Sequence, residues 1–442
     1  MTKTFPRGIH IGHRKELTQS LPIQKAALPK RVILPLQQNL GAPAEAIVKV
    51  GDVVAEGQKV ADSGKFVSAP IHAPIAGKVT RIEKHLTAAG IAVPSIVIEA
   101  AEEVPAVMPL EAARSWKEMD RDAIRKAIRE AGIVGLGGAT FPAHVKLSPP
   151  AEKKIEAVII NGCECEPYLT VDHRLMLERP REILSGAGAI ARAVGAERII
   201  LGIENNKPDA IESLRAEAAK EDLSHVEIVP LATKYPQGGE KMLIKAIMGR
   251  EVPSGGLPMD VGVVVHNVGT TVAIAEALET GKPLIERVVT VTGSGIREPK
   301  NLLVRIGTPF AEVIAQCGGL TEDAAKVIMG GPMTGTAVSS LDVPVVKATS
   351  SILVLNRKDA ATFVEGACIR CGRCIKACPV GLMPSHIAEA TKHKNWEKVA
   401  ACHVADCIEC GCCAYGCPAR IYLLQYCKVA KRELQLRKAV GK

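Results

Sequence analysis

The sequence has few aromatic residues and no long apolar run. Aromatic side chains make up 3% of the 442 residues, so we expect cores built from Val, Ile, Leu and Ala. The longest apolar candidate, residues 261–278, is interrupted by His266, Asn267 and Glu276, whereas a membrane-spanning helix needs about 20 apolar residues. The first six residues also lack the apolar segment of a secretory signal. We therefore expect a soluble or peripheral protein in a reducing compartment.

The bulk composition is that of a folded protein with several domains. Hydrophobic residues make up 47% and charged residues 23% of the chain, and its length predicts about two to four domains. The net charge is +9, and residues 428–442 hold six Lys or Arg and one Glu. This basic tail is interpreted either as a solvated helix end or as a surface attracted to anionic headgroups or to an acidic partner.

Eight of the 14 cysteines fall in two tandem runs, each of the form C-x2-C-x2-C-x3-C-P. This spacing is typical of ferredoxins with two [4Fe–4S] clusters, in which the fourth cysteine of each run ligates the other cluster. A chain with two such clusters transfers single electrons. The spacing predicts one cluster at Cys368, Cys371, Cys374 and Cys417, and a second at Cys407, Cys410, Cys413 and Cys378. For the other six cysteines we expect ordinary packing roles.

The pattern of short strands, Gly/Pro turns and helices predicts a multidomain α/β protein. Between residues 31 and 105, short strands with regular turns predict a small barrel or sandwich. Alternating strands and helices predict a largely parallel sheet further on, and then a β-grasp module. The expected segments are an irregular N-terminus (1–30), a barrel-sandwich (31–105), an α/β domain (115–285), a β-grasp domain (286–357), a helical ferredoxin unit with helices in its long spacer (360–427) and a basic tail (428–442).

The barrel region resembles the lipoyl and biotinyl barrel-sandwich family. The resemblance rests on the segment from Val50 to Gln58 and on the segment from Ile71 to Val79. The family's modified lysine would stand at Phe66, with Lys65 beside it. The resemblance therefore implies the fold without the covalent cofactor.

A glycine-rich loop follows the helix expected at residues 121–131. A dinucleotide-binding loop of the ordinary kind requires a strand before it and a helix after it, and here the preceding element is a helix. The backbone N–H groups of Gly135, Gly137 and Gly138 can nevertheless hold a phosphate, with Lys146 as the opposite charge. The alternative is a purely structural turn between a helix and a strand.

Polar residues follow three of the expected strands. They form the segments 161–167, 235–240 and 266–270, and each contains glycine. Because α/β sheets bind ligands at the carboxyl ends of their strands, we expect these loops to surround one crevice together with the glycine loop.

These four loops together resemble the flavin-binding fold of the NADH-oxidising subunit of respiratory complex I. The resemblance implies that FMN binds noncovalently and that NADH stacks on it, with Glu166 and Glu240 holding the nicotinamide ribose or ring. Both could instead be ordinary acids at helix starts. Positions that depart from the complex I pattern are Leu136, Leu147, Cys163 and Gly239. The implied cofactor contacts are Gly135, Gly137, Gly138, Phe141, Lys146, Asn161, Glu164, Tyr235, Gly238, Asn267 and Thr270.

The order of domains along the whole chain is similar to that of the RnfC family, which belongs to the Rnf ion-translocating electron transport complexes. The resemblance implies an NAD-side module of a ferredoxin:NAD oxidoreductase, carrying FMN and two [4Fe–4S] clusters. It would lie peripherally on the cytoplasmic face of the bacterial cell membrane, with membrane and iron–sulfur subunits and NAD(H) as partners, ferredoxin as an indirect one, and no nucleic acid. Two alternatives remain open: a flavin iron–sulfur cobalamin reductase of a microcompartment, and an iron–sulfur relay with a vestigial flavin site.

Overall fold

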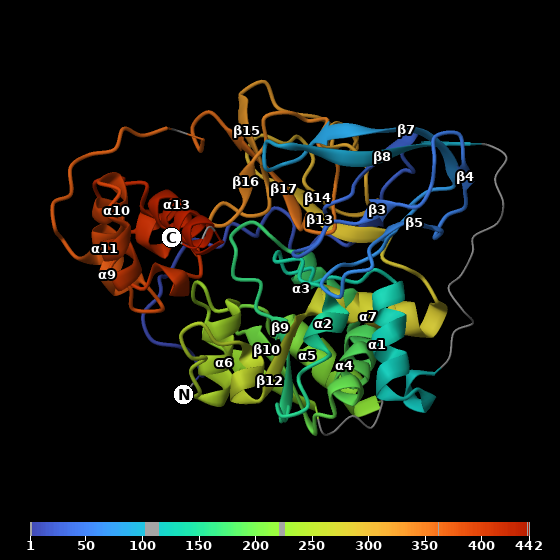
Figure 1. Ribbon diagram of the computed structural model, residues 1–442, viewed down its shortest axis with the longest axis horizontal. Coiled ribbons are helices and arrows are strands. Elements are labelled where there is room, and N and C mark those ends of the chain that lie inside the picture. The colour runs from blue at the N-terminus through green and yellow to red at the C-terminus, as the bar shows by residue number, and fades with distance from the viewer. Residues whose placement is uncertain (1, 102–114, 221–225, 361, 440, 442) are drawn as a thin grey trace.

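The computed structural model describes residues 2–101, 115–220, 226–360, 362–439 and 441 (Figure 1). The boundary expected between the barrel and the α/β region, at residues 105–115, falls largely outside the described residues. The described part confirms the expected multidomain architecture, with a small β domain, an α/β domain, a mixed β domain and a helical C-terminal lobe. No helix in these ranges is both long enough and apolar enough to cross a bilayer.

The N-terminal domain consists of two small sheets packed on a common core. One sheet has the order β2-β8-β7-β4 and the other β3-β5-β6. Val32, Leu34 and Ile98 are fully buried in this core, as the apolar strand patterns predict. The strands are β2 (Arg31–Pro35), β3 (Glu45–Ala46), β4 (Val53–Val54), β5 (Lys59–Asp62), β6 (Ile71–His72), β7 (Gly77–Leu86) and β8 (Ala92–Ala100).

The α/β domain has a four-stranded sheet with the order β11-β10-β9-β12, and all its pairs are parallel. Alternate residues of β9 face opposite ways: Ile160 packs in the core with α4 and α7, whereas Ile159 packs with α6. Helices cover both faces, as is usual for parallel sheets. The elements are α1 (Arg121–Glu130), α2 (Ala143–Lys146), β9 (Ala157–Gly162), α3 (Val171–Glu178), α4 (Pro180–Val194), β10 (Arg198–Glu204), α5 (Pro208–Lys220), β11 (Val226–Leu231), α6 (Glu240–Met248), β12 (Val263–Asn267) and α7 (Val268–Thr280).

The strand order of this sheet reverses between β9 and β12. The chain runs from β9 outward to β10 and β11, and then returns to place β12 on the other side of β9. Ligands of open α/β sheets bind outside the carboxyl ends of the strands at such a switch point. The loops after β9 and β12 are two of the loops that the sequence predicted to surround a crevice.

The third domain has a six-stranded sheet with the order β1-β14-β13-β17-β15-β16. Helix α8 (Phe310–Ala315) packs on it through Phe310 and Val313. Its strands are β1 (Ile23–Lys25), β13 (Glu286–Thr292), β14 (Lys300–Arg305), β15 (Ala324–Met329), β16 (Thr336–Ala337) and β17 (Ser351–Asn356). Strand β1 pairs in parallel with β14. It lies in the N-terminal segment 1–30, so the expectation that this whole segment is irregular was wrong.

The C-terminal lobe is helical and lies beside the other domains (Figure 1). The spacer between the two cysteine runs forms two helices, as expected from its length. Residues 428–439 of the basic tail belong to helix α13, which packs on both. The helices are α9 (Arg373–Ala377), α10 (Pro384–Lys392), α11 (Trp396–Ala401), α12 (Cys412–Tyr415) and α13 (Leu423–Ala439).

Candidate functional site

The glycine loop, residues 135–138, is a tight turn that contacts the start of α7. It is closed by a bridge between Val134 and Pro142, and the N–H of Gly135 donates to the carbonyl of Phe141 at 2.9 Å. The Leu136 N–H donates to Oγ1 of Thr270 at 2.8 Å. Because a Cβ at position 137 would lie 3.2 Å from the Cβ of Asn267, glycine permits this close approach. Predicted cofactor residues from two loops therefore meet at the switch point.

The same loop has the features of an anion-binding cradle. Within the described residues, the N–H groups of Gly137, Gly138 and Ala139 have no hydrogen-bond acceptor. Gly138 has a φ of 111°, and an added Cβ there would meet nothing within 4 Å, so this side of the loop is open. Successive free N–H groups attract phosphate oxygens. The loop therefore fits the phosphate of a flavin mononucleotide.

Lys146 and Glu240 form an ion pair that joins the glycine loop to the loop after β11. Nζ of Lys146 lies 2.6 Å from Oε1 of Glu240 and donates to the carbonyl of Val265 at 2.7 Å. The side chains of the pair are 25% and 39% exposed, so neither is fully buried. The pair thus holds one positive and one negative side chain, from Lys146 after the glycine loop and from Glu240 at the start of α6.

Asn161 links the end of β9 to the loop after β11. Its Nδ2 donates to the carbonyl of Gly238 at 2.8 Å, and its Oδ1 accepts the N–H of Cys163 at 3.2 Å. A Cβ at position 238 would lie 3.3 Å from the Cβ of Cys163, so glycine keeps these two loops in contact.

The two glutamates of the acidic loop (residues 161–167) form hydrogen bonds and ion pairs with other residues of the chain. Oε1 of Glu164 accepts the N–H of Asp172 at 2.7 Å, and its Oε2 pairs with Nζ of Lys15 at 3.4 Å. Glu166 accepts hydrogen bonds from the Thr334 hydroxyl at 2.5 Å and from the Met333 N–H at 3.2 Å, and the Tyr235 hydroxyl oxygen lies 3.3 Å from its Oε1. Burial raises the pKa of Glu166. Glu166 therefore ties the crevice to the third domain, a role that its sequence position did not predict.

Asp172 is a part of the crevice that the sequence reasoning missed. Its Oδ2 accepts Nδ2 of Asn267 at 2.7 Å, while Oδ1 of Asn267 caps α7 by accepting the N–H of Gly269 at 2.9 Å. Burial and the charge of Glu164 raise the pKa of Asp172 to about 7. The signal that could have identified it is a carboxylate at the start of a helix directly after the acidic loop.

Tyr235 connects the crevice to the C-terminal lobe. Its hydroxyl donates to the carbonyl of Cys410 at 2.8 Å, and its ring packs with Ile11 and Cys412 in one apolar cluster. The loop that carries a predicted flavin contact thus touches the second cysteine run directly.

Cysteines of both runs line one small cavity in the C-terminal lobe. Cys378 of the first run lies there with Cys407, Cys410 and Cys413 of the second. Two further cysteines, Cys412 and Cys427, also line it. Within the described residues no three ligating side chains converge on a single point.

The cysteines predicted for the other cluster lie nearer the surface. Cys368 and Cys371 are exposed, Cys374 is buried and Cys417 is half-buried. Cys374 and Cys417 pack in one apolar cluster together with Leu423. The donor set, soft thiolates beside an apolar core, suits iron–sulfur chemistry.

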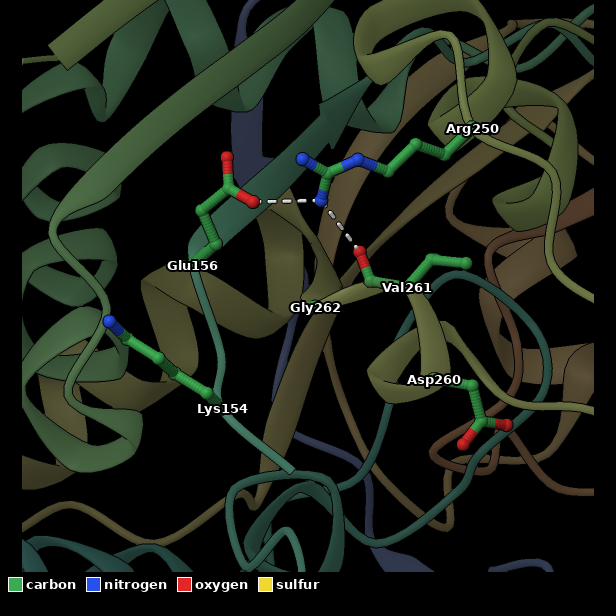
Figure 2. Close-up of a pocket in the computed structure, with 6 residues that line it drawn as sticks. All are labelled: Lys154, Glu156, Arg250, Asp260, Val261 and Gly262. Atoms are coloured by element: carbon green, nitrogen blue, oxygen red, sulfur yellow. Dashed lines mark hydrogen bonds and ion pairs between the residues drawn. The ribbon is translucent and has the colours of Figure 1, made fainter. Parts of the chain in front are cut away.

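A large cavity lies at the amino ends of the strands, away from the loops that follow their carboxyl ends. It has a volume of about 620 Å³ and is lined by the residues before β9 and β12 (Figure 2). Arg250 pairs there with Glu156 at 2.7 Å and donates to the carbonyl of Val261 at 3.0 Å. Lys153 pairs with Asp260 at 2.9 Å. Arg250 and Glu156 thus neutralise each other in this open depression, and Lys153 at its margin neutralises Asp260.

Four known family models match successive parts of the chain. They describe an RnfC barrel sandwich hybrid domain at residues 3–103, a Nuo51 FMN-binding domain at 128–276, an SLBB domain at 288–337 and a 4Fe-4S dicluster domain at 367–421. The glycine loop and the three polar loops described above lie within the second of these matches, and both cysteine runs lie within the fourth. An FMN-binding domain and a dicluster domain are thus both present, as the sequence predicted.

The chain is also similar to curated proteins over nearly its full length. It is 47% identical to a subunit of the Na(+)-translocating ferredoxin:NAD(+) oxidoreductase complex of Acetobacterium woodii, over 99% of this chain and 98% of that protein. It is 49% identical to the corresponding subunit of the proton-translocating complex of Clostridium ljungdahlii, over 88% of this chain and 84% of that protein. It is 44% identical to the corresponding subunit of the ion-translocating oxidoreductase complex of Rhodobacter capsulatus, over 98% of this chain and 83% of that protein.

Among solved structures, an NAD+-reducing [NiFe]-hydrogenase in the H2-reduced state has a similar fold. The TM-score is 0.52 at 20% identity, and the match covers 76% of this chain and 70% of that one. At that identity the match supports the fold alone. Together with the relatives and the family models, these findings show that the chain belongs to the RnfC family of the ion-translocating ferredoxin:NAD(+) oxidoreductase (Rnf) complexes.

Proposed function

We propose that the protein is the NAD-side subunit of an ion-translocating ferredoxin:NAD oxidoreductase complex. It passes electrons between NAD(H), FMN and two [4Fe–4S] clusters and exchanges them with partner subunits. The observation that carries the proposal is the contact of Tyr235 with Cys410, which joins the flavin crevice to the cysteine cavity through one hydrogen bond of 2.8 Å.

Bound FMN supplies the conversion between a hydride, which carries two electrons, and the single electrons that clusters accept. The protein's own residues bind and orient the reactants. The free N–H groups at Gly137 and Gly138 hold the phosphate, and Lys146 neutralises it. Glu240, the accessible carboxylate of the crevice, orients the nicotinamide ribose or ring. Asn161 and Asn267 fix the loops that enclose the flavin.

For the metal sites, we propose the crossed ligand sets that the motif predicts. Cys368, Cys371, Cys374 and Cys417 ligate one cluster, and Cys407, Cys410, Cys413 and Cys378 ligate the other. The shared cavity of Cys378 with the second run supports the second set.

The partners in this proposal are the other subunits of the complex, NAD(H) directly and ferredoxin indirectly. The protein is held peripherally at the cytoplasmic face of the cell membrane by its partners. Support comes from the names of relatives, which describe ferredoxin:NAD(+) oxidoreductase complexes that translocate Na+ or protons.

The test uses the full chain, reconstituted without oxygen with iron, sulfide and FMN. We expect one FMN and about eight iron atoms per chain, bleaching of the flavin absorbance by NADH, and then EPR signals of reduced clusters. A chain that binds its iron but releases no flavin on acid treatment would refute the NAD-side role and leave an iron–sulfur relay. Copurification with a microcompartment shell instead of membrane subunits would favour the cobalamin reductase alternative.

A further inference from the structure

The N-terminal segment crosses the edge of the flavin crevice before it reaches the third domain. Ile9 forms a two-way backbone bridge with Tyr235, with both N–H to O distances at 2.9 Å. The carbonyl of His13 accepts the N–H of Tyr168 at 2.9 Å, and Thr18 accepts the Thr170 hydroxyl at 2.8 Å. The segment thus contacts the loops after β9 and β11 one after the other.

Lys15 is the centre of these contacts. Its ammonium group donates to the carbonyls of Glu164 at 2.9 Å, of Glu166 at 3.1 Å and of Leu169, and it pairs with the Glu164 carboxylate. Its side chain is 5% exposed. An ammonium group has three donors and no acceptor, so all three of its N–H groups are used on this loop. The acidic loop is therefore wrapped around a buried cation.

This arrangement keeps the acidic loop in an unusual conformation. Glu164 and Tyr168 both have positive φ, at 46° and 71°, which is unfavourable for residues with a side chain. Lys15 donates a hydrogen bond to the carbonyl of Glu164, and the carbonyl of His13 accepts the N–H of Tyr168. Without the ammonium group, the carbonyls of Glu164, Glu166 and Leu169 and one oxygen of the buried Glu164 carboxylate would lose their partner, which is costly away from water.

The effect of Lys15 extends to the predicted flavin contacts. Glu164, held by Lys15 at one oxygen, accepts the Asp172 N–H at the other. Asp172 in turn holds Nδ2 of Asn267, which caps α7 beside the glycine loop. Lys15 thus lies at one end of a continuous chain of contacts that ends at the flavin loop.

We infer that Lys15 is a positioning residue for FMN binding: it acts through Glu164 to place the acidic loop and Asn267 around the flavin. The inference rests on the proposed function, since it requires that FMN occupies the crevice. It also makes the N-terminal segment a part of the flavin site, although that segment lies outside the matched Nuo51 FMN-binding domain at residues 128–276.

The experiment compares Lys15→Met, Lys15→Arg and Lys3→Met in the reconstituted full chain. Lys3 is the matched control, because it lies on the same segment and its Nζ donates to the carbonyl of Ile247 on α6 at 3.2 Å, away from the acidic loop. We expect Lys15→Met to raise the FMN Kd by roughly tenfold or more, with wild-type iron content. We expect Lys15→Arg to recover part of the affinity and Lys3→Met to bind FMN like the wild type.

A second variant pair separates positioning from general stability. If Lys15 acts by compensating Glu164, the double variant Lys15→Met/Glu164→Gln should bind FMN more tightly than Lys15→Met alone, because the uncompensated buried charge is gone. An unchanged FMN Kd in Lys15→Met would overturn the inference. Equal losses of iron, flavin and thermal stability, without rescue by Arg or by the double variant, would also overturn it. A wild-type chain that binds no FMN would instead refute the proposed function itself.

Discussion

Single residues of the crevice act mainly through one another. The sequence pointed to Glu166 and Glu240 as a pair with one task, yet their surroundings differ. Glu240 is 39% exposed and faces Lys146. Glu166 accepts from the third domain at both oxygens. These differences depend on contacts between residues 94 positions apart for Glu240 and 168 positions apart for Glu166, and no local pattern encodes them. For the same reason Lys15 and Asp172 were not predicted as site residues.

At this scale, Lys146→Ala should lower FMN occupancy while leaving iron content unchanged. The ammonium group is the counter-charge that the sequence predicted for the phosphate, and it also holds Glu240 at 2.6 Å. Losing one charge-assisted contact to a phosphate costs about 1.5–3 kcal/mol, or roughly 10- to 150-fold in Kd. The measurements are flavin fluorescence titration and iron analysis. Lys154→Ala, in the depression at the amino ends of the strands, is the control, and a parallel loss of iron would indicate a folding role instead.

Asp172→Asn should stabilise the protein increasingly as the pH rises. Burial and Glu164 raise the pKa of Asp172 from an unfolded value near 3.8 to about 7. The folded state then binds a proton that the unfolded state has lost, so the wild type loses stability between about pH 4 and pH 7. The loss amounts to a few kcal/mol, since each pKa unit is ~1.4 kcal/mol. Melting temperatures of both proteins from pH 5 to pH 8 check this. A difference that does not change with pH would contradict it.

Elements were more predictable from the sequence than site residues were. The sequence predicted a strand at residues 198–204 and a helix at 240–248, and these agree with β10 and α6 at both ends. The helix predicted at 121–131 agrees with α1 to within one residue. Their boundaries are marked locally: Asp120 caps α1 by accepting the Ala123 N–H at 2.7 Å, and Gly249 ends α6 with a φ of 71°. Helices α2 and α3 and strand β1 were missed. Helices α2 and α3 are short. Strand β1 is defined by its pairing with β14, which lies far away in the sequence.

The crossing of the two cysteine runs is a prediction about elements, since each run supplies a loop and a short helix. Cys378→Ala should damage the cluster of Cys407, Cys410 and Cys413, whose cavity it shares. EPR with iron analysis should show loss of that cluster's signal while the other cluster is kept. Cys402→Ala serves as the control, because Cys402 lies outside both runs. Selective loss of the cluster at Cys368, Cys371 and Cys374 would contradict the crossing.

At the scale of the whole molecule, three domains meet around the loop that carries Tyr235. Its hydroxyl reaches Cys410 of the C-terminal lobe and Glu166 of the crevice, and Glu166 binds the third domain through Thr334. The domain order was readable from the sequence, because each domain has its own pattern of glycine, strand or cysteine spacing. The contacts between domains were not, because they are made by isolated residues from separate motifs.

Tyr235→Phe should therefore slow electron transfer between domains without affecting the hydride step. Phenylalanine keeps the apolar packing with Ile11 and Cys412 but removes the bond to the Cys410 carbonyl. If that bond contributes about 1 kcal/mol to docking, the ratio of docked to undocked lobe falls about fivefold. Stopped-flow mixing with NADH should show flavin bleaching at the wild-type rate and slower cluster reduction. Tyr415→Phe, exposed on the same lobe, should behave like the wild type. Slowing of both phases in Tyr235→Phe would place the hydroxyl in nicotinamide binding, and equal rates in all three proteins would show that this contact does not limit transfer.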